Sequence, residues 1–122
     1  MHSTRQLVDL TKELATYSRA TIRKAGCVIV DKDRNILSQG FTTRLAGKDV
    51  VHAEIATLLN CQESGAAEMF VTAHPCKECA KAIIYARIRV VYSPEPNYDS
   101  WGFSEMAAER MFQDNGVQWK QL

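Results

Sequence analysis

Hydrophobic residues near the start of the chain recur at helical spacing. One face of this segment is formed by Leu7, Leu10, Leu14 and Tyr17. The charged residues Arg5, Asp9, Lys12 and Glu13 lie off this face, so the pattern predicts an amphipathic first helix. Ser3 stands directly before this segment and is the predicted N-cap.

The next apolar stretch has the pattern of a β-hairpin. Residues 26–30 are mostly apolar and β-branched, residues 31–35 are polar, and residues 36–41 form a second, partly apolar run. This order predicts two antiparallel strands joined by a turn. Residues 42–51 are polar and contain Gly47, so we expect a loop there.

The rest of the chain alternates helical and strand patterns. The expected elements are a helix from His52 to about Cys61, a strand over 67–73, a helix over 76–86, a strand over 88–92, a helix over about 100–114 and a strand over 117–122. The helix over 100–114 carries Phe103, Met106 and Met111 at helical spacing. A crossover helix makes the strands that it joins parallel. The chain is therefore predicted to form one α/β domain over residues 1–122, with the last two strands parallel.

Charge and composition narrow the classes of partner. The chain has 15 Lys and Arg against 14 Asp and Glu, a formal net charge of +1. Proteins that grip long phosphate backbones usually show a clear basic excess, so a small-molecule substrate is favoured over a nucleic-acid polymer. No segment resembles a membrane helix or a secretory signal. We therefore expect a cytoplasmic protein without membrane contact, whose four cysteines are thiols or metal ligands.

Two cysteines and a histidine have the spacing of zinc ligands. Cys76 and Cys79 lie at the start of a predicted helix, where positions i and i+3 share one side. His52 lies at the start of another helix. Catalytic zinc takes three protein ligands and keeps an open position, whereas structural zinc takes four. Cys27 and Cys61 are expected in the core, so no fourth ligand is evident and the pattern favours catalytic Zn²⁺.

A carboxylate completes this arrangement. Glu54 follows His52 by two residues and can reach a water at the metal without binding the metal itself. Zinc lowers the pKa of such a water towards neutrality, and Glu54 would accept the proton. A lone Cys-x-x-Cys is equally typical of redox pairs and zinc ribbons. His-x-Glu followed by Pro-Cys-x-x-Cys is the signature of the zinc deaminases.

With these motifs, the chain resembles the cytidine deaminase superfamily, and most of all its deoxycytidylate (dCMP) deaminases. The resemblance rests on residues 24–30, 52–56, 72–84, 90–92, 98–100 and 115–117. It implies a three-layer α-β-α fold around a five-stranded mixed sheet, with Zn²⁺ held by His52, Cys76 and Cys79. It also implies Glu54 as the proton shuttle, dCMP as the substrate, and dUMP and ammonia as the products.

The resemblance further implies which residues contact the substrate. The backbone of Ala53 and the segment that contains His74 would hold the edge of the base, although His74 is also explained as a residue that ends a strand. Tyr98 would pack beside the nucleotide. Thr42 stands where the family usually has an asparagine that contacts the sugar. Arg23 is one of several basic residues expected near the 5′-phosphate; the others are Arg19, Lys24, Arg44 and Lys48.

Three functions stay open at this point. The first is a dCMP-type nucleotide deaminase. The second is a deaminase of another substrate, such as adenosine in tRNA, a nucleoside or a modified cytosine. The third is a zinc-stabilised binding module without activity. The charge balance counts against tRNA, and Glu54 counts against an inactive module. The resemblance also implies a homo-oligomer, and the departure at Thr42 leaves regulation by dCTP or dTTP open.

Overall fold

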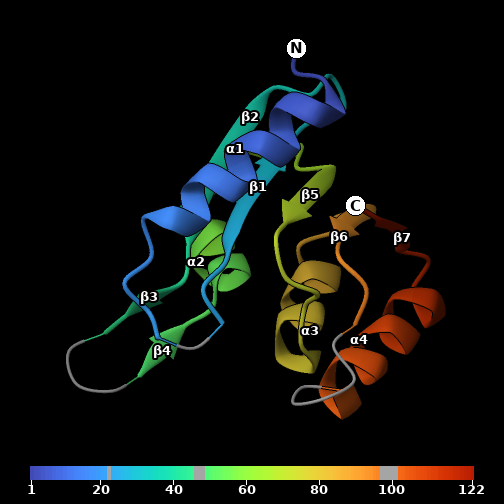
Figure 1. Ribbon diagram of the computed structural model, residues 1–122. Helices are drawn as coiled ribbons and strands as arrows, with labels where there is room; N and C mark the ends of the chain where they lie inside the picture. Colours follow the sequence, from blue (N-terminus) through green and yellow to red (C-terminus); the bar gives the residue numbers. More distant parts are fainter. Residues whose placement is uncertain (22, 46–48, 97–101) are drawn as a thin grey trace.

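The central feature of the protein is a five-stranded mixed sheet (Figure 1). The structure is a computed structural model that describes residues 1–21, 23–45, 49–96 and 102–122. The strands lie in the order β2-β1-β5-β6-β7. Their bounds are β1 (Gly26–Val30), β2 (Ile36–Phe41), β5 (Glu68–Val71), β6 (Val90–Ser93) and β7 (Gln118–Gln121).

Strand direction changes across this sheet. Strand β1 is antiparallel to both β2 and β5, whereas β5, β6 and β7 run parallel to one another. The parallel pairs follow from the helices that connect these strands. A crossover helix returns the chain to the same end of the sheet, so the next strand runs in the same direction. The prediction of a mixed sheet with parallel last strands is confirmed.

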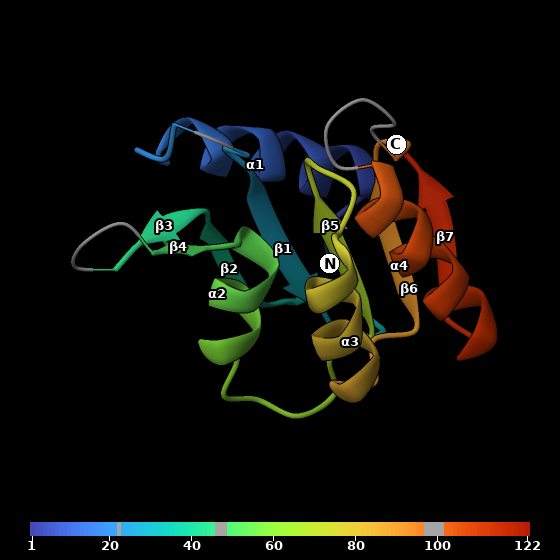
Figure 2. The same ribbon diagram turned by 90° about the horizontal axis from the view of Figure 1, so that it is seen from below.

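Helices cover both faces of the sheet, which gives three layers (Figure 2). Helix α1 (Thr4–Thr16) lies on one face, and α2 (Ala53–Leu59), α3 (Lys77–Tyr85) and α4 (Gly102–Asp114) lie on the other. The interior strand β1 is buried on both sides. Cys27 and Ile29 pack in the cluster under α2, α3 and α4, and Val28 and Val30 pack in the cluster under α1. Cys27 is a core residue, as expected.

The segment before α2 differs from the predicted loop. Within residues 42–51, β3 (Thr43–Arg44) and β4 (Val50–Val51) form a short antiparallel ribbon. The polar composition of this segment led to the prediction of a loop, although two of the four paired residues are valines. The prediction of an unstructured connection was wrong here, and the ribbon places its second strand directly before His52.

Helix α1 has both a defined start and a close contact with the sheet. The Ser3 hydroxyl accepts a hydrogen bond from the backbone N–H of Gln6, and the Gln6 side chain accepts one from the backbone of Ser3. This capping box confirms the predicted N-cap. At Gly26, an added Cβ would lie 2.1 Å from the carbonyl oxygen of Thr11. Glycine therefore allows α1 to pack directly on the start of β1.

Two helix starts differ from the predicted bounds by one residue. His52 and Cys76 were expected as the first helical residues, but both are extended N-caps, with ψ angles of 150° and 174°. Neither side chain forms a cap hydrogen bond with its own helix, which matters for the site described below. In the described part of the chain, no helix combines the length and the apolarity needed to cross a membrane.

Candidate metal centre and active site

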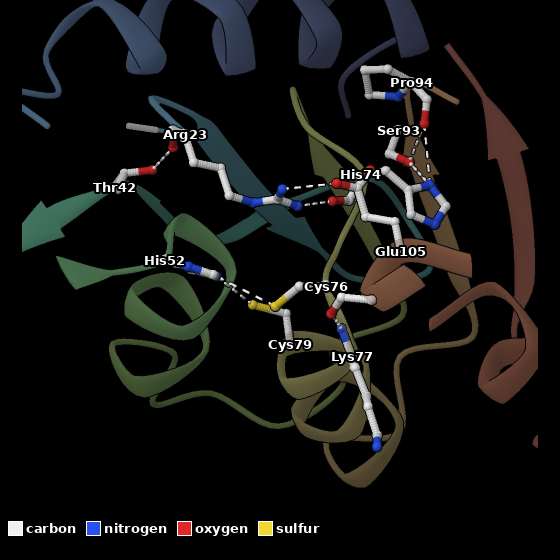
Figure 3. A network of polar contacts seen from close by, with 11 residues as sticks. Arg23, Thr42, His52, His74, Cys76, Lys77, Cys79, Ser93, Pro94 and Glu105 are labelled. Atoms are coloured by element: carbon white, nitrogen blue, oxygen red, sulfur yellow. Dashed lines mark hydrogen bonds and ion pairs between the residues drawn. The ribbon is translucent and has the colours of Figure 1, made fainter. Parts of the chain in front are cut away.

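Three side chains converge where α2 and α3 begin. The Nδ1 atom of His52 lies 3.3 Å from the Sγ atom of Cys79 and 3.5 Å from that of Cys76 (Figure 3). The ligand atoms of all three residues lie within 4.8 Å of one another. Tetrahedral zinc with the usual Zn–N and Zn–S bond lengths separates nitrogen from sulfur by about 3.6 Å. The donor set therefore fits Zn²⁺ with little rearrangement.

The local backbone explains this convergence. His52 and Cys76 are the N-caps of α2 and α3, and Cys79 lies within the first turn of α3. The two sulfur atoms thus come from one helix start and the nitrogen from another, across the line where α2 contacts α3. The predicted ligand set is brought together as three residues, which is the number typical of a catalytic zinc.

Ionisation of these ligands is mutually dependent. The hydrogen bond with Cys79 lowers the pKa of Cys76 to about 3. The same hydrogen bond and, to a smaller extent, burial raise the pKa of Cys79. The hydrogen bond with Cys76 raises the pKa of His52. The charge of each group thus depends on the other two, and a dication between them would favour both thiolates and a neutral imidazole.

Glu54 lies in the first turn of α2, immediately beside this cluster. Its side chain is buried, with 1% of the residue exposed, and burial raises the pKa of the carboxyl group. Within the described residues, its Oε2 atom has no hydrogen-bond partner. A buried carboxylate without a partner is unfavourable unless it serves a ligand or a reaction. This orphaned acceptor is the second observation that fits a catalytic metal site.

Thr42 and Arg23 lie beside the site, but both have other partners. The Thr42 hydroxyl donates to the carbonyl oxygen of Arg23 at 2.8 Å and accepts from the backbone N–H of Ala25 at 3.1 Å. The Arg23 guanidinium forms an ion pair with Glu105 and donates to the carbonyl oxygen of His74. The predicted contacts of Thr42 and Arg23 with substrate stay predictions.

The other predicted substrate residues have different surroundings. Ala53 is fully buried at the first position of α2. The His74 ring lies with its Nδ1 atom 3.2 Å from both the Ser93 hydroxyl and the Pro94 carbonyl oxygen, and it points towards these residues, away from Cys76 and Cys79 (Figure 3). Burial lowers the pKa of His74. Direct contact of this imidazole with substrate stays a prediction, and Tyr98 lies outside the described residues.

Sequence reasoning missed Glu105. This glutamate is 1% exposed and shares the buried face of α4 with Ala108 and Phe112. Its spacing from these residues is helical, so a carboxylate on an apolar helix face was the available signal. The prediction instead concentrated on neighbouring residues of the helix such as Met106, which is half exposed.

Comparison with known proteins agrees with this site. The sequence profile of the cytidine and deoxycytidylate deaminase zinc-binding region matches residues 1–94. A probable deoxycytidylate deaminase from Caenorhabditis elegans is 28% identical over 137 aligned positions, which cover 96% of this chain and 68% of that protein. A tRNA-specific adenosine deaminase from Agrobacterium fabrum is 40% identical over 73 positions, 55% of this chain and 48% of that protein.

The fold also matches that of a solved enzyme. The crystal structure of dCMP deaminase from the cyanophage S-TIM5 in apo form has a TM-score of 0.78 and 24% identity, covering 97% of this chain and 95% of that one. The same phage enzyme was solved in complex with dCMP and dUMP, with a TM-score of 0.78, 22% identity, and coverage of 94% and 93%.

These matches establish the class of the protein. The relatives are deaminases, which are hydrolases acting on carbon–nitrogen bonds, and the family profile contains the zinc-binding region in which His52, Cys76 and Cys79 lie. The ligand geometry and the profile agree on Zn²⁺ as the cofactor. The chain belongs to the cytidine and deoxycytidylate deaminase family.

Proposed function

We propose that the protein deaminates a cytosine nucleotide, converting dCMP and water to dUMP and ammonia. The observation that carries this proposal is the convergence of His52, Cys76 and Cys79 beside the buried Glu54 carboxylate, whose Oε2 atom has no hydrogen-bond partner among the described residues. The Caenorhabditis elegans relative, which aligns with nearly the whole chain, supports dCMP as the substrate. The proposal includes a cytoplasmic homo-oligomer that acts on a free nucleotide.

The chemistry requires one new bond and one broken bond at C4 of the pyrimidine. Zn²⁺, when bound by His52, Cys76 and Cys79, makes water nucleophilic near neutral pH. Glu54 accepts the proton that this water loses as the C4–O bond forms. It delivers this proton to N3 of the ring, then takes the second proton from the new hydroxyl group on C4 and passes it to the exocyclic amine. Protonation makes the amine a leaving group, so the C4–N bond breaks and ammonia departs.

The surroundings of Glu54 suit its role in proton transfer. The carboxylate is shielded from bulk solvent, and burial raises its pKa above the usual range, which makes it a better proton acceptor than an exposed glutamate. Because its Oε2 atom has no partner among the described residues, no protein hydrogen bond must break before a proton is taken up. The backbone of Ala53, the segment before Cys76 and Tyr98 are proposed to hold the base.

The phosphate is proposed to bind in a groove between the end of α1 and the ribbon strand β3. Arg19, Arg44, Tyr17 and Phe41 line this groove, which has a volume of about 400 Å³. Strand β3, which carries Arg44, pairs with the strand that ends directly before His52. Two guanidinium groups suit a phosphate because each can donate two parallel hydrogen bonds.

A second candidate substrate is adenosine in tRNA, which the similarity to the Agrobacterium fabrum enzyme favours. This similarity covers only about half of either chain. The near-neutral charge of the chain is weaker support for a polymer than for a nucleotide. One assay with both substrate classes distinguishes the candidates.

The test is to incubate the zinc-loaded protein with dCMP, CMP, deoxycytidine, cytosine and a tRNA anticodon stem, and to measure released ammonia. Glu54→Gln serves as the control that keeps the metal ligands. Release from dCMP that Glu54→Gln abolishes is the expected outcome. Release from the tRNA stem alone would transfer the assignment to the second candidate. If no substrate releases ammonia although the protein holds one zinc per chain, both candidate functions are refuted.

A further inference from the structure

A buried ion pair near the metal centre joins two parts of the chain that are far apart in sequence. Arg23 lies between α1 and β1, and Glu105 lies in the first turn of α4. The Arg23 Nη1 atom is 2.9 Å from the Glu105 Oε2 atom, and the two side chains are 8% and 2% exposed. These residues are 82 positions apart in sequence. The pair therefore ties α4 to the segment that precedes the sheet.

Net stability alone is a weak reason for this pair. Removing two charges from water is expensive, and their mutual attraction often does no more than offset that loss. Apolar residues of similar volume frequently stabilise a fold as well as a buried ion pair does. The geometry that the pair imposes is therefore a better guide to its role.

The guanidinium of Arg23 has a second partner close to the metal ligands. Its Nη2 atom donates to the carbonyl oxygen of His74, two residues before the ligand Cys76 (Figure 3). Because the guanidinium is planar, the bond to Glu105 fixes the direction of the bond to His74. Arg23 thereby connects the position of α4 to the backbone that leads into the metal site.

The backbone of Arg23 is held as firmly as its side chain. Arg23 has a φ angle of 54°, in the left-handed region that residues other than glycine adopt rarely. The hydroxyl of Thr42 donates to its carbonyl oxygen at 2.8 Å. A residue kept in an unfavourable conformation by its neighbours has few alternative positions. The guanidinium is thus fixed from the main chain and from Glu105 at once.

We propose that Arg23 and Glu105 are a positioning pair that holds the His74–Cys76 backbone in register with His52. This inference rests on the proposed function only for its activity readout. Arg23 acts through the carbonyl oxygen of His74, and it sets the position of the Cys76 ligand and of the backbone that would face the base. Without the pair, the His74 carbonyl oxygen loses its hydrogen bond to the Arg23 guanidinium, and both zinc retention and substrate binding weaken.

The test separates positioning from simple stabilisation by replacing one or both partners. Arg23→Met and Glu105→Met each leave one buried charge unpaired, so both should lower the unfolding temperature. The double variant removes both charges and should recover most of that loss. It should nevertheless release zinc to a chelator about tenfold faster than the parent protein, and it should show an increased KM for dCMP, as expected for loss of a residue that orients a metal ligand.

A milder variant covers the case in which methionine prevents folding. Arg23→Lys keeps the charge opposite Glu105 but has no planar fork for the second bond. It should unfold near the parent temperature while losing zinc about tenfold faster. Arg34→Lys is the matched control, because Arg34 also has a positive φ of 65° and pairs with a glutamate, Glu68, at 2.6 Å. This control should leave zinc release unchanged.

Parent-like zinc release and KM in both Arg23→Lys and the double variant would overturn the proposal, since the pair would then act only on stability. Equal acceleration of zinc release by Arg34→Lys would also overturn it, because the effect would not be specific to the site. An inactive parent protein would refute the proposed function but not this inference, since zinc release is measured without substrate.

Discussion

Replacing Glu54 by glutamine should change stability and activity in opposite directions. Glutamine has nearly the same shape as glutamate but no charge. In the metal-free protein, the carboxylate is 1% exposed, and its Oε2 atom has no partner among the described residues. The charge therefore opposes folding at neutral pH, and its removal should stabilise the metal-free chain. Activity should fall, because glutamine cannot carry protons from water to the amine.

The magnitudes follow from the burial of this group. An unsatisfied buried polar group destabilises a protein by about 1–3 kcal/mol, and more when it is charged. Glutamine retains part of that penalty, so a net gain of about 1 kcal/mol is expected. For a chain of this length, such a gain raises the unfolding temperature by about 4 °C. Loss of a general acid–base group should lower kcat by about 10²- to 10⁴-fold.

Two measurements check this prediction. Thermal unfolding is followed by circular dichroism in the presence of a chelator, and ammonia release is followed with the zinc-loaded protein. Glu63→Gln is the control, because Glu63 is exposed and should tolerate the same chemical change without effect. A Glu54→Gln protein that is less stable than its metal-free parent would refute the argument from burial. One that retains zinc and deaminates within threefold of the parent would refute the proton-transfer role.

Three further predictions concern other parts of the molecule. Gly26→Ala should destabilise the protein by about 3 kcal/mol in urea unfolding, because its Cβ would lie 2.1 Å from the Thr11 carbonyl oxygen; unchanged stability would mean that α1 moves freely on the sheet. Hydrogen bonding from the backbone of Asn35 lowers the pKa of Asp31, so this carboxylate stabilises the fold above its unfolded pKa of 3.8, and that contribution is lost as pH falls through the folded value. Asp31→Asn should therefore make the free energy of unfolding less dependent on pH in the acid range. An unaltered pH profile of the free energy of unfolding would contradict this role of Asp31. Arg44→Ala should raise the KM for dCMP about tenfold while leaving that for deoxycytidine unchanged, the loss expected for a charged hydrogen bond; equal effects on both substrates would place the phosphate elsewhere.

Local patterns predicted much of this structure. The hairpin, the first helix with its Ser3 cap and the ligands Cys76 and Cys79 are each encoded within a few neighbouring residues. Their identification requires only spacing and residue type. The approach of His52 to these cysteines is a tertiary contact, but the known order of the deaminase motif supplied it.

Two of the missed features depend on contacts between segments that are far apart in sequence, and the third is a ribbon of very short strands. Glu105 is buried because Arg23, far away in sequence, neutralises it, and nothing near Glu105 in the sequence indicates this partner. Thr42 was interpreted by its position in a family motif, yet its hydroxyl is engaged with the backbone of Arg23 and Ala25. The ribbon of β3 and β4 is too short for a periodic signal. Periodicity identifies which elements form, whereas partner choice over long separations requires the fold.

The seam between the antiparallel and parallel parts of the sheet has a consequence for folding. The β1–β2 hairpin can form from adjacent residues, whereas β5, β6 and β7 become neighbours only after crossover helices have packed. His52 follows the hairpin, and Cys76 follows β5, so the three ligands meet only when both parts have docked. We therefore expect zinc to bind late in folding. Zinc added during refolding should not accelerate the early folding steps. It should lower the rate at which the folded protein unfolds at the boundary between the antiparallel and parallel parts of the sheet.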